Sequence, residues 1–304
     1  MALQSSGAIT LAQIASEFND STPHSLSEFY RNGGKVPGNN TNVPTSGAIS
    51  LSNFYSATNA VTETITGTTT NLNVSTQFGS NFTSSIPKIL IINSGVQVGA
   101  TSLSNYAINV PSGMGGTLDI QNAGTVSGAG GDGSSSGNGG TGGTAVYISS
   151  NNVTVTNTGT IRGGGGGGGR GANGSAGTTQ SQSIFLCQGG SAGSGGAGGN
   201  GQGYDQSQSN GSNGTGGGSR TAYLSYDIGA GPGAGPSQFQ CDAWNVYSNG
   251  TGGSSGGNGG TYGNAGSQGG GGGSQGGAAG KYIGLASGIS LANSPSGTLQ
   301  GTAP

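Results

Sequence analysis

Most of the glycine in this chain lies in one tract, because 56 of its 72 glycines fall between residues 124 and 280. Ordering glycine costs more backbone entropy than ordering any other residue, so such a tract should be disordered unless its backbones pack closely. Extended helices with three residues per turn allow that packing, since glycine lets neighbouring backbones approach within reach of Cα–H···O=C contacts. The tract therefore predicts packed polyglycine helices of the polyproline-II type, with the other residues displayed as loops.

The longest glycine runs locate these helices. We expect them over residues 163–169, 195–201, 214–218, 250–260 and 269–273. A Cβ on a glycine that faces a neighbouring helix would have no room. Replacing Gly165 or Gly271 with Val should therefore cost more than the roughly 1 kcal/mol of glycine's backbone preference alone.

Composition narrows the class of protein further. Hydrophobic residues make up 29% of the 304 residues and charged residues 5%, with a formal net charge of −2. Disordered chains are usually charged, and conventional globular cores need more apolar residues than this. The basic residues are scattered, so we expect no nucleic acid partner. The longest apolar run, residues 89–92, is too short for membrane insertion, and the first residues lack a secretory signal pattern.

Residues 1–58 carry three copies of a short pattern in which Ser or Thr precedes Leu, and a hydrophobic residue follows three positions later. Thr10 with Gln13, and Ser25 with Glu28, have the spacing of a capping box. The copies predict short helices with a common hydrophobic face, in a module too small to bury much surface alone. We expect it to be an anchoring module whose side chains pack together or onto a partner, through Leu11, Ile14, Phe18, Leu26, Phe29, Leu51 and Phe54.

Residues 59–160 have a different composition, rich in Thr, Asn, Val and Ile. Alternation of apolar and polar residues predicts strands there. We expect them over residues 65–74, 88–92 and 106–110.

An internal repeat lies within this region, because residues 117–131 match residues 152–166 at an offset of 35 positions. Each copy has alternating apolar residues, then Asn-x-Gly, then another apolar position, which predicts strand, turn and strand. Repetition of that unit predicts the coils of a β-helix. Residues 93–95 resemble an earlier, looser copy, and residues 289–298 resemble a later, degenerate one.

Islands with aromatic residues interrupt the glycine tract, chiefly at residues 178–188, 204–210, 220–228 and 236–248. Aromatic rings among Ser, Asn and Gly are typical of binding loops. The candidate binding residues in these loops are Phe185, Tyr204, Tyr223, Tyr226, Phe239, Trp244 and Tyr247. These rings could instead cap the ends of the glycine sandwich, and for any single residue the two interpretations weigh equally. Cys187 and Cys241 lie in two of the islands, and whether they form a disulfide stays open.

Catalysis finds little support in the sequence. His24 is the one histidine, and a lone histidine is more often structural than a general base. No carboxylate pair, nucleophile elbow or phosphate loop stands out. Cysteine and histidine are too few for a metal site of their kind. We therefore expect a protein that is not an enzyme and that uses neither a cofactor nor a metal.

Two groups of residues resemble known phage proteins. Residues 6–11 and 46–51 share Ser-Gly-Ala-Ile-[Thr/Ser]-Leu, which resembles an N-terminal element of tailed-bacteriophage structural proteins. Residues 153–167 resemble the glycine-rich tips of phage tail-fibre proteins, and the alternation of glycine runs with variable islands is similar to the distal adhesins of T-even-type long tail fibres. That resemblance implies a sandwich of polyglycine helices whose variable loops contact a bacterial receptor. The N-terminal element departs from the attachment region of those adhesins.

The fold class we expect is mostly β and irregular. Its domains are a small helical anchor (1–58), β-helix-like strand repeats (59–160) and a glycine-rich domain with aromatic loops (161–304). The first hypothesis for function is a tail-fibre tip adhesin, assembled in the host cytoplasm, that binds a surface glycan or outer-membrane protein. Its N-terminus would dock on other virion proteins, and a homotrimer is one oligomeric state open to it. The second hypothesis is a virion protein without a receptor, such as a head decoration or fibre-shaft subunit; an ice-binding bundle is a weaker third.

Overall fold

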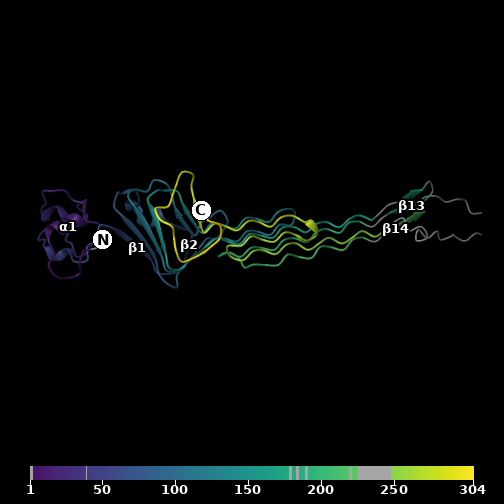
Figure 1. The fold of residues 1–304 in the computed structure, drawn as a ribbon, viewed down its shortest axis with the longest axis horizontal. Coiled ribbons are helices and arrows are strands. Elements are labelled where there is room, and N and C mark those ends of the chain that lie inside the picture. The colour runs from purple at the N-terminus through teal and green to yellow at the C-terminus, as the bar shows by residue number, and fades with distance from the viewer. Residues whose placement is uncertain are drawn as a thin grey trace, which may run out of the picture.

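The computed structural model describes residues 3–38, 40–177, 180–182, 185–188, 191–218, 221–224 and 248–304. The chain is long and narrow (Figure 1). A helical module at the N-terminus is followed by stacked strands, then by long extended segments, and a small antiparallel sheet lies at the far end. The C-terminus returns to the stacked strands.

The N-terminal module contains three short helices, α1 (Leu11–Glu17), η1 (Leu26–Phe29) and η2 (Leu51–Phe54). Thr10 and Gln13 form the expected capping box at α1. The capping box expected of Ser25 and Glu28 is wrong, because Ser25 makes no side-chain cap. In a capping box the Glu28 carboxylate would accept a hydrogen bond from the Ser25 N–H. It instead forms an ion pair with Lys35, whose Nζ lies 2.9 Å away.

Three phenylalanines form the centre of this module. Phe18, Phe29 and Phe54 come one from the end of each helix, and their ring centroids lie 6.1 to 6.3 Å apart. These rings and Ile14 are buried, whereas Leu11 and Leu26 pack against them partly exposed and Leu51 is 37% exposed. Four of the seven predicted anchor side chains are thus internal, and the leucine that begins each helix remains accessible.

A charged cluster stabilises the same module. Lys35 Nζ lies 2.5 Å from Asp20 Oδ1, and His24 Nδ1 lies 3.2 Å from Asp20 Oδ2. The pKa of Asp20 is lowered to about 2, chiefly by the hydrogen bond from Lys35 and also by the hydrogen bond with His24. Because a lowered carboxyl pKa stabilises the folded state above the unfolded pKa, this contribution is lost only as the pH falls towards 2.

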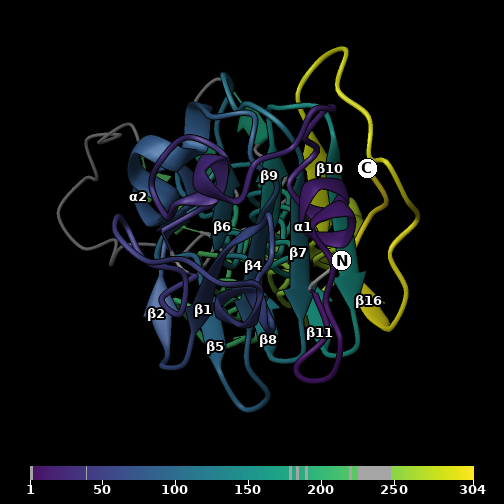
Figure 2. The ribbon, with the colours of Figure 1, turned by 90° about the vertical axis from the view of Figure 1, so that its left-hand side faces the viewer.

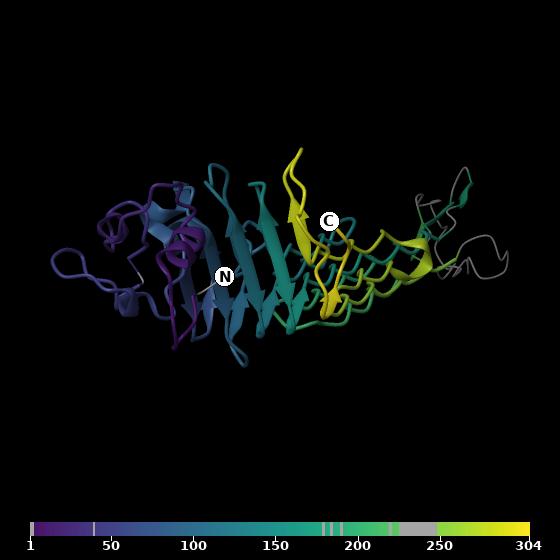
Figure 3. The same cartoon turned by 60° about the vertical axis from the view of Figure 1, so that its left-hand side comes forward.

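The stacked strands form three parallel sheets in a solenoid-like arrangement, seen from the side in Figure 3 and from the N-terminal end in Figure 2. The first sheet contains β1 (Val61–Ile65), β4 (Lys88–Ile92), β7 (Leu118–Asn122) and β10 (Val153–Asn157). The second contains β2 (Thr69–Thr70), β5 (Gln97–Gly99), β8 (Thr125–Ser127), β11 (Thr160–Arg162) and β16 (Thr298–Gln300). The third contains β3 (Leu72–Asn73), β6 (Ile108–Val110), β9 (Val146–Ile148) and β15 (Ile283–Leu285).

The predicted strand over residues 88–92 is β4, whereas the other two strand predictions need correction. Residues 65–74 are not one strand, because the chain turns twice there and the segment holds the end of β1, then β2 and β3. Residues 106–110 form the shorter β6. Each turn moves the chain to the next face of the solenoid, and an alternation pattern alone does not reveal such corners.

The repeat of 35 residues sets the register of neighbouring coils. Val153 lies opposite Leu118, Asn157 opposite Asn122, and Ile161 opposite Val126, as the repeat pairs them. The looser copy is offset, since Ile92 and not Asn93 lies opposite Asn122.

The predicted degenerate copy over residues 289–298 contributes the last coil. The Asn293 side chain bonds both the N–H and the C=O of Val155 at the open edge of β10. The strand β16 then begins at Thr298, opposite Thr160 of β11. The sequence grouped residues 283–300 with the glycine-rich domain. Their strands β15 and β16 instead pair with strands of the solenoid.

Apolar side chains from alternate positions fill the interior, including Leu90, Ile120 and Val155. The helices α2 (Val74–Phe78) and η3 (Gly79–Thr83) bury Val74, Phe78 and Phe82 in the same core. Lys88 is also buried, and its Nζ donates to the carbonyls of Ser84, Ile86 and Gly115 at 2.8 to 2.9 Å. Burial lowers the pKa of this lysine, and the three carbonyls satisfy its N–H groups.

An asparagine pair connects two coils at the first corner. Asn122 Nδ2 donates to Asn157 Oδ1 at 2.7 Å, and both side chains are at most 2% exposed. Asn122 Oδ1 also accepts the N–H of Gly124 at 3.1 Å, and Asn157 Nδ2 donates to the carbonyl of Ser296 at 2.8 Å. The polar turn residues of the repeat are therefore an internal hydrogen-bonded ladder.

Replacing Asn122 with Ala should lower the stability of the solenoid. It leaves the buried Asn157 Oδ1 and the Gly124 N–H without partners, which should cost about 1–3 kcal/mol. The control is Thr64→Ala at an exposed position of β1, which should stay within about 0.5 kcal/mol. Thermal unfolding followed by circular dichroism measures both, and equal midpoints for the two variants would contradict the ladder's role.

Candidate functional site

The candidate site is the glycine-rich part of the chain, which extends from the solenoid as a stalk of parallel and antiparallel extended segments (Figure 1). Gly128 follows β8 and Gly163 follows β11, so strands of the solenoid continue directly into the stalk. The segments of the stalk are residues 128–133, 138–143, 163–174, 193–203, 209–218, 250–260, 264–269 and 274–280.

Segment 163–174 runs through the centre of this stalk. Its backbone N–H groups donate to segments 138–143, 193–203 and 264–269 in rotation, and the order repeats every third residue. The bonds, all of 2.7 to 3.0 Å, run from Gly164 to Gly143, Gly165 to Gln202, Gly166 to Asn264, Gly167 to Gly140, Gly168 to Gly199 and Gly169 to Ser267.

The carbonyls of the central segment accept from three further segments. Gly131 N–H donates to Gly165, Gly260 N–H to Gly166, and Gly280 N–H to Gly164, each at 2.8 Å. The central segment is therefore enclosed by the three segments to which it donates and the three that donate to it. Its residues 163–169 are all buried. Direct N–H···O=C bonds thus join the segments, in addition to the Cα–H···O=C contacts expected from sequence.

Close approach of these backbones explains why the stalk consists of glycine. A Cβ built on Gly165 would lie 2.0 Å from the carbonyl oxygen of Gly260, and one on Gly168 would lie 1.9 Å from that of Gly257. Such distances exclude any side chain unless the segments separate. At Gly216, in the outer segment 209–218, a Cβ would meet nothing within 4 Å.

Side chains replace backbone partners at the edge of the stalk. Between segments 193–203 and 209–218, three hydroxyls accept a backbone N–H each: Ser194 donates to Thr215 Oγ1 at 2.7 Å, Ala197 to Ser212 Oγ at 2.8 Å, and Asn200 to Ser209 Oγ at 2.7 Å. This role of the three hydroxyls was not predicted from the sequence. The sequence signal for this role is the three-residue spacing of Ser209, Ser212 and Thr215, which matches the three-residue period of the segments.

One predicted glycine helix is wrong. Residues 269–273 contain the 3₁₀ turn η5 (Gly270–Gly272), in which Gly271 has φ of 65°. A side chain at Gly271 is therefore disfavoured by the positive φ and by Ser254 Oγ, which lies 2.3 Å from a built Cβ. We still expect Gly271→Val to lower the stability of the protein. The cause is the geometry of the turn and not packing between glycine helices.

A small antiparallel sheet forms at the far end of the stalk, where β13 (Phe185–Gln188) lies between β12 (Gln180–Gln182) and β14 (Thr221–Leu224). Phe185 pairs with Leu224, and Leu186 pairs with Tyr223. The islands 178–188 and 220–228, which are separated by more than thirty residues of sequence, therefore meet at one place. Two of the predicted receptor residues, Phe185 and Tyr223, have their backbones in this sheet.

Tyr204 lies elsewhere, at the solenoid end of the stalk. Its N–H donates to the carbonyl of Gly128 at 3.0 Å, and its ring lies over Gly99, where a built Cβ would meet the ring 2.0 Å away. Tyr226, Phe239, Trp244 and Tyr247 lie outside the described residues. The Cys187–Cys241 pairing is likewise outside them, since Cys241 and the Cys187 side chain are not described.

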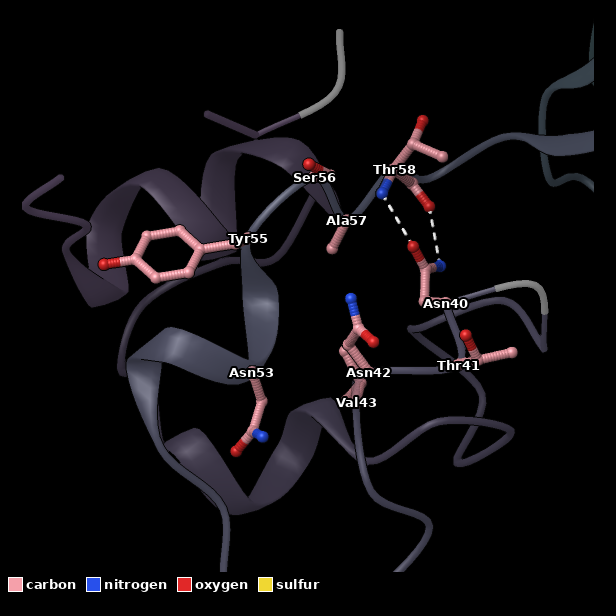
Figure 4. A pocket seen from close by; sticks show the side chains of 9 residues that line it. All are labelled: Asn40, Thr41, Asn42, Val43, Asn53, Tyr55, Ser56, Ala57 and Thr58. Carbon is pink, nitrogen blue, oxygen red and sulfur yellow. Dashed lines mark hydrogen bonds between the residues drawn. The ribbon is translucent and has the colours of Figure 1, made fainter. Parts of the chain in front are cut away.

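The described residues offer little that resembles a catalytic centre. A pocket of about 130 Å³ in the N-terminal module is lined by Asn40, Asn53, Tyr55 and their neighbours (Figure 4). Asn40 there bonds the backbone N–H and C=O of Thr58, both at 2.8 Å, so its polar atoms are used internally. Within the described residues, no group of three potential metal ligands occurs, and no helix has the length and hydropathy to span a bilayer.

The arrangement as a whole defines a class of protein, one with a solenoid base, a stalk of packed glycine segments and a small antiparallel sheet at the far end of the stalk. Residues 60–304 match the family model of the phage tail fibre adhesin Gp38, and the chain belongs to that family. It is therefore a receptor-binding protein of the phage tail-fibre tip, a virion component and not an enzyme.

No curated protein matches the chain. Among solved structures, the chain is similar to the crystal structure of the gp37-gp38 adhesin tip complex of the bacteriophage S16 long tail fiber, with 21% identity, a TM-score of 0.45 and 100% of both chains covered.

Replacing Gly165 with Ala should destabilise the stalk. The new methyl group would overlap the Gly260 carbonyl, so the loss should exceed glycine's backbone effect by about 1–3 kcal/mol of overpacking. The matched control is Gly216→Ala in the outer segment, which has open space and should be neutral or slightly stabilising. Thermal unfolding distinguishes the two, and a silent Gly165→Ala would mean that the stalk is not close-packed.

Proposed function

We propose that the far end of the stalk, where the islands 178–188 and 220–228 meet at β13 and β14, is the surface that contacts the host receptor. The observation that carries this proposal is the pairing of β13 with β14, which joins two aromatic islands at the end opposite the N-terminal module. Membership of the adhesin family supports it. Aromatic residues with Ser and Gly neighbours suit either a surface glycan or an outer-membrane protein.

The stalk, on this proposal, is a sandwich of polyproline-II-type glycine helices that holds the tip away from the solenoid. The three-residue rotation of hydrogen bonds along segment 163–174 supports it, because a helix with three residues per turn presents every third residue to the same neighbour. Such a helix has no internal hydrogen bonds, so all of its N–H groups are free to bond across segments. The resulting stalk is stiff, and a stiff support lowers the entropy cost of ordering binding loops.

Residues 1–58 are the proposed anchor to the tail fibre. They have their own aromatic core, and the family match begins only at residue 60, so this module lies outside the matched adhesin region. Leu11, Leu26 and Leu51 begin the three helices and stay accessible. The solved relative is a complex of gp38 with gp37, and we propose a fibre protein as the partner here too.

Alanine at the candidate receptor residues of the islands should abolish or redirect cell binding. Tyr223→Ala, Tyr226→Ala and Trp244→Ala should each leave the thermal midpoint almost unchanged, because the stalk does not depend on them. Tyr204→Ala provides the contrast, since its ring packs over Gly99, and it should lower stability more than binding. Binding of labelled protein to host cells and thermal unfolding are measured for all four. The proposal is overturned if alanine variants of the islands lose their fold while those that stay folded still bind host cells normally.

Deleting residues 1–58 should leave a folded protein that no longer enters virions. A sharper test is Leu51→Asp, which places a charge on the accessible helix start and should weaken incorporation. Leu103→Asp is the matched control, because Leu103 is 40% exposed against 37% for Leu51 but lies on the solenoid. Quantitative mass spectrometry of purified particles reports incorporation. Normal incorporation of both the deletion and Leu51→Asp would exclude the anchor role.

A further inference from the structure

The chain contains eight Asn-Gly pairs, and the stalk holds most of them. They are Asn32-Gly33, Asn138-Gly139, Asn173-Gly174, Asn200-Gly201, Asn210-Gly211, Asn213-Gly214, Asn249-Gly250 and Asn258-Gly259. Asn-Gly is the dipeptide most prone to spontaneous deamidation, because glycine has no Cβ to hinder attack of its own nitrogen on the preceding side chain. The structure distinguishes these eight chemically similar sites.

The glycine N–H is hydrogen-bonded in seven of the eight pairs. In chain order the acceptors are Tyr30 O, Gln275 O, Gly193 O, Gly131 O, Asn258 Oδ1, Gly218 O and Ser209 O, at 2.8 to 3.1 Å. Gly214 is the exception: among the described residues neither its N–H nor its C=O has a hydrogen-bond partner. The backbone groups of Asn213 and its side-chain amide also have none among the described residues, and Asn213 is exposed.

We propose that Asn213 is a site of spontaneous, structure-directed deamidation, with water as the co-reactant. The Gly214 nitrogen loses its proton and attacks Cγ of Asn213, forming a five-membered succinimide and releasing ammonia. Water then opens the ring at either carbonyl, which gives aspartate or isoaspartate. No oxidant or reductant is required, and the net change is an amide and water converted to a carboxylic acid and ammonia.

Hydrogen bonding selects the site because the attacking nitrogen must turn towards the side chain. At the seven other pairs that movement first breaks a hydrogen bond of the glycine N–H, to Tyr30 in the same turn for Gly33 and to a neighbouring segment for the other six, so the reaction waits for local opening of the structure. At Asn213 the peptide unit can turn without breaking any bond. Asn210 is the sharpest comparison, since it is also exposed and lies three residues earlier in the same segment, but Gly211 N–H is held by Asn258 Oδ1 at 3.1 Å.

The product changes the stalk locally. Ser212 and Thr215 flank the site and donate their N–H groups to Ala197 and Ser194, each at 2.8 Å. Isoaspartate routes the chain through the side-chain carbonyl and adds one backbone atom between these anchors, which breaks the three-residue period. Either product adds a negative charge to a chain whose formal net charge is −2. Virions would therefore acquire a modified stalk with age, in the segment that leads to β14.

The test is an ageing experiment on the purified full-length protein in mildly alkaline buffer. Peptide mapping by mass spectrometry follows the mass gain at each Asn-Gly pair, and isoaspartyl methyltransferase labelling identifies isoaspartate. In the folded protein we expect Asn213 to react about tenfold or more faster than Asn210, because the latter requires local opening. The same experiment in denaturant should bring the two rates together.

The variant Asn213→Gln provides a second control, since a glutamine side chain would have to form a six-membered ring and should stay intact while the fold is kept. Equal rates at Asn213 and Asn210 in the folded protein would overturn the proposal. A preference for Asn213 that persists in denaturant would also overturn it, because sequence and not structure would then select the site.

Discussion

The backbone hydrogen bonds between glycine segments are the interaction on which the rest of this structure depends. Glycine costs about 0.5–1 kcal/mol more to order than alanine, and a backbone hydrogen bond returns only about 0.5–1.5 kcal/mol net. The stalk can therefore be ordered only if almost every N–H and C=O finds a partner. The central segment 163–174 achieves this through bonds to six neighbouring segments. At the edge of the stalk, the hydroxyls of Ser209, Ser212 and Thr215 accept N–H groups in place of backbone carbonyls.

The solenoid provides the starting register for that network. Strands β8 and β11 pair in parallel and continue into segments 128–133 and 163–174, so Gly128 N–H already donates to Arg162 at 2.9 Å. Segments 138–143 and 274–280 return to β9 and β15, which also pair in parallel. A conventional apolar core thus fixes the relative positions of segments that have no side chains with which to specify their own alignment.

The stalk and the islands at its far end differ in the residues that they require. The stalk needs glycine at its packed positions, whereas the islands that meet at its far end carry aromatic and polar residues. The pairing of β13 with β14 brings two of these islands to the tip, at the opposite end of the molecule from the N-terminal module. The stalk therefore separates this small sheet from the N-terminal module by its whole length.

The sequence by itself determined the periodic parts of this protein. The offset of 35 residues predicted the pairing of Val153 with Leu118, because identical coils bury the same positions when stacked, and the glycine runs predicted close-packed segments because only glycine fits there. Tertiary structure alone decided the rest. No local sequence pattern predicts that Tyr204 packs over Gly99 or that residues 269–273 form a turn. Nor does one predict that Lys35 pairs with the Glu28 carboxylate, which was expected to cap Ser25. These outcomes depend on contacts between segments distant in the chain, whose spacing no repeat encodes.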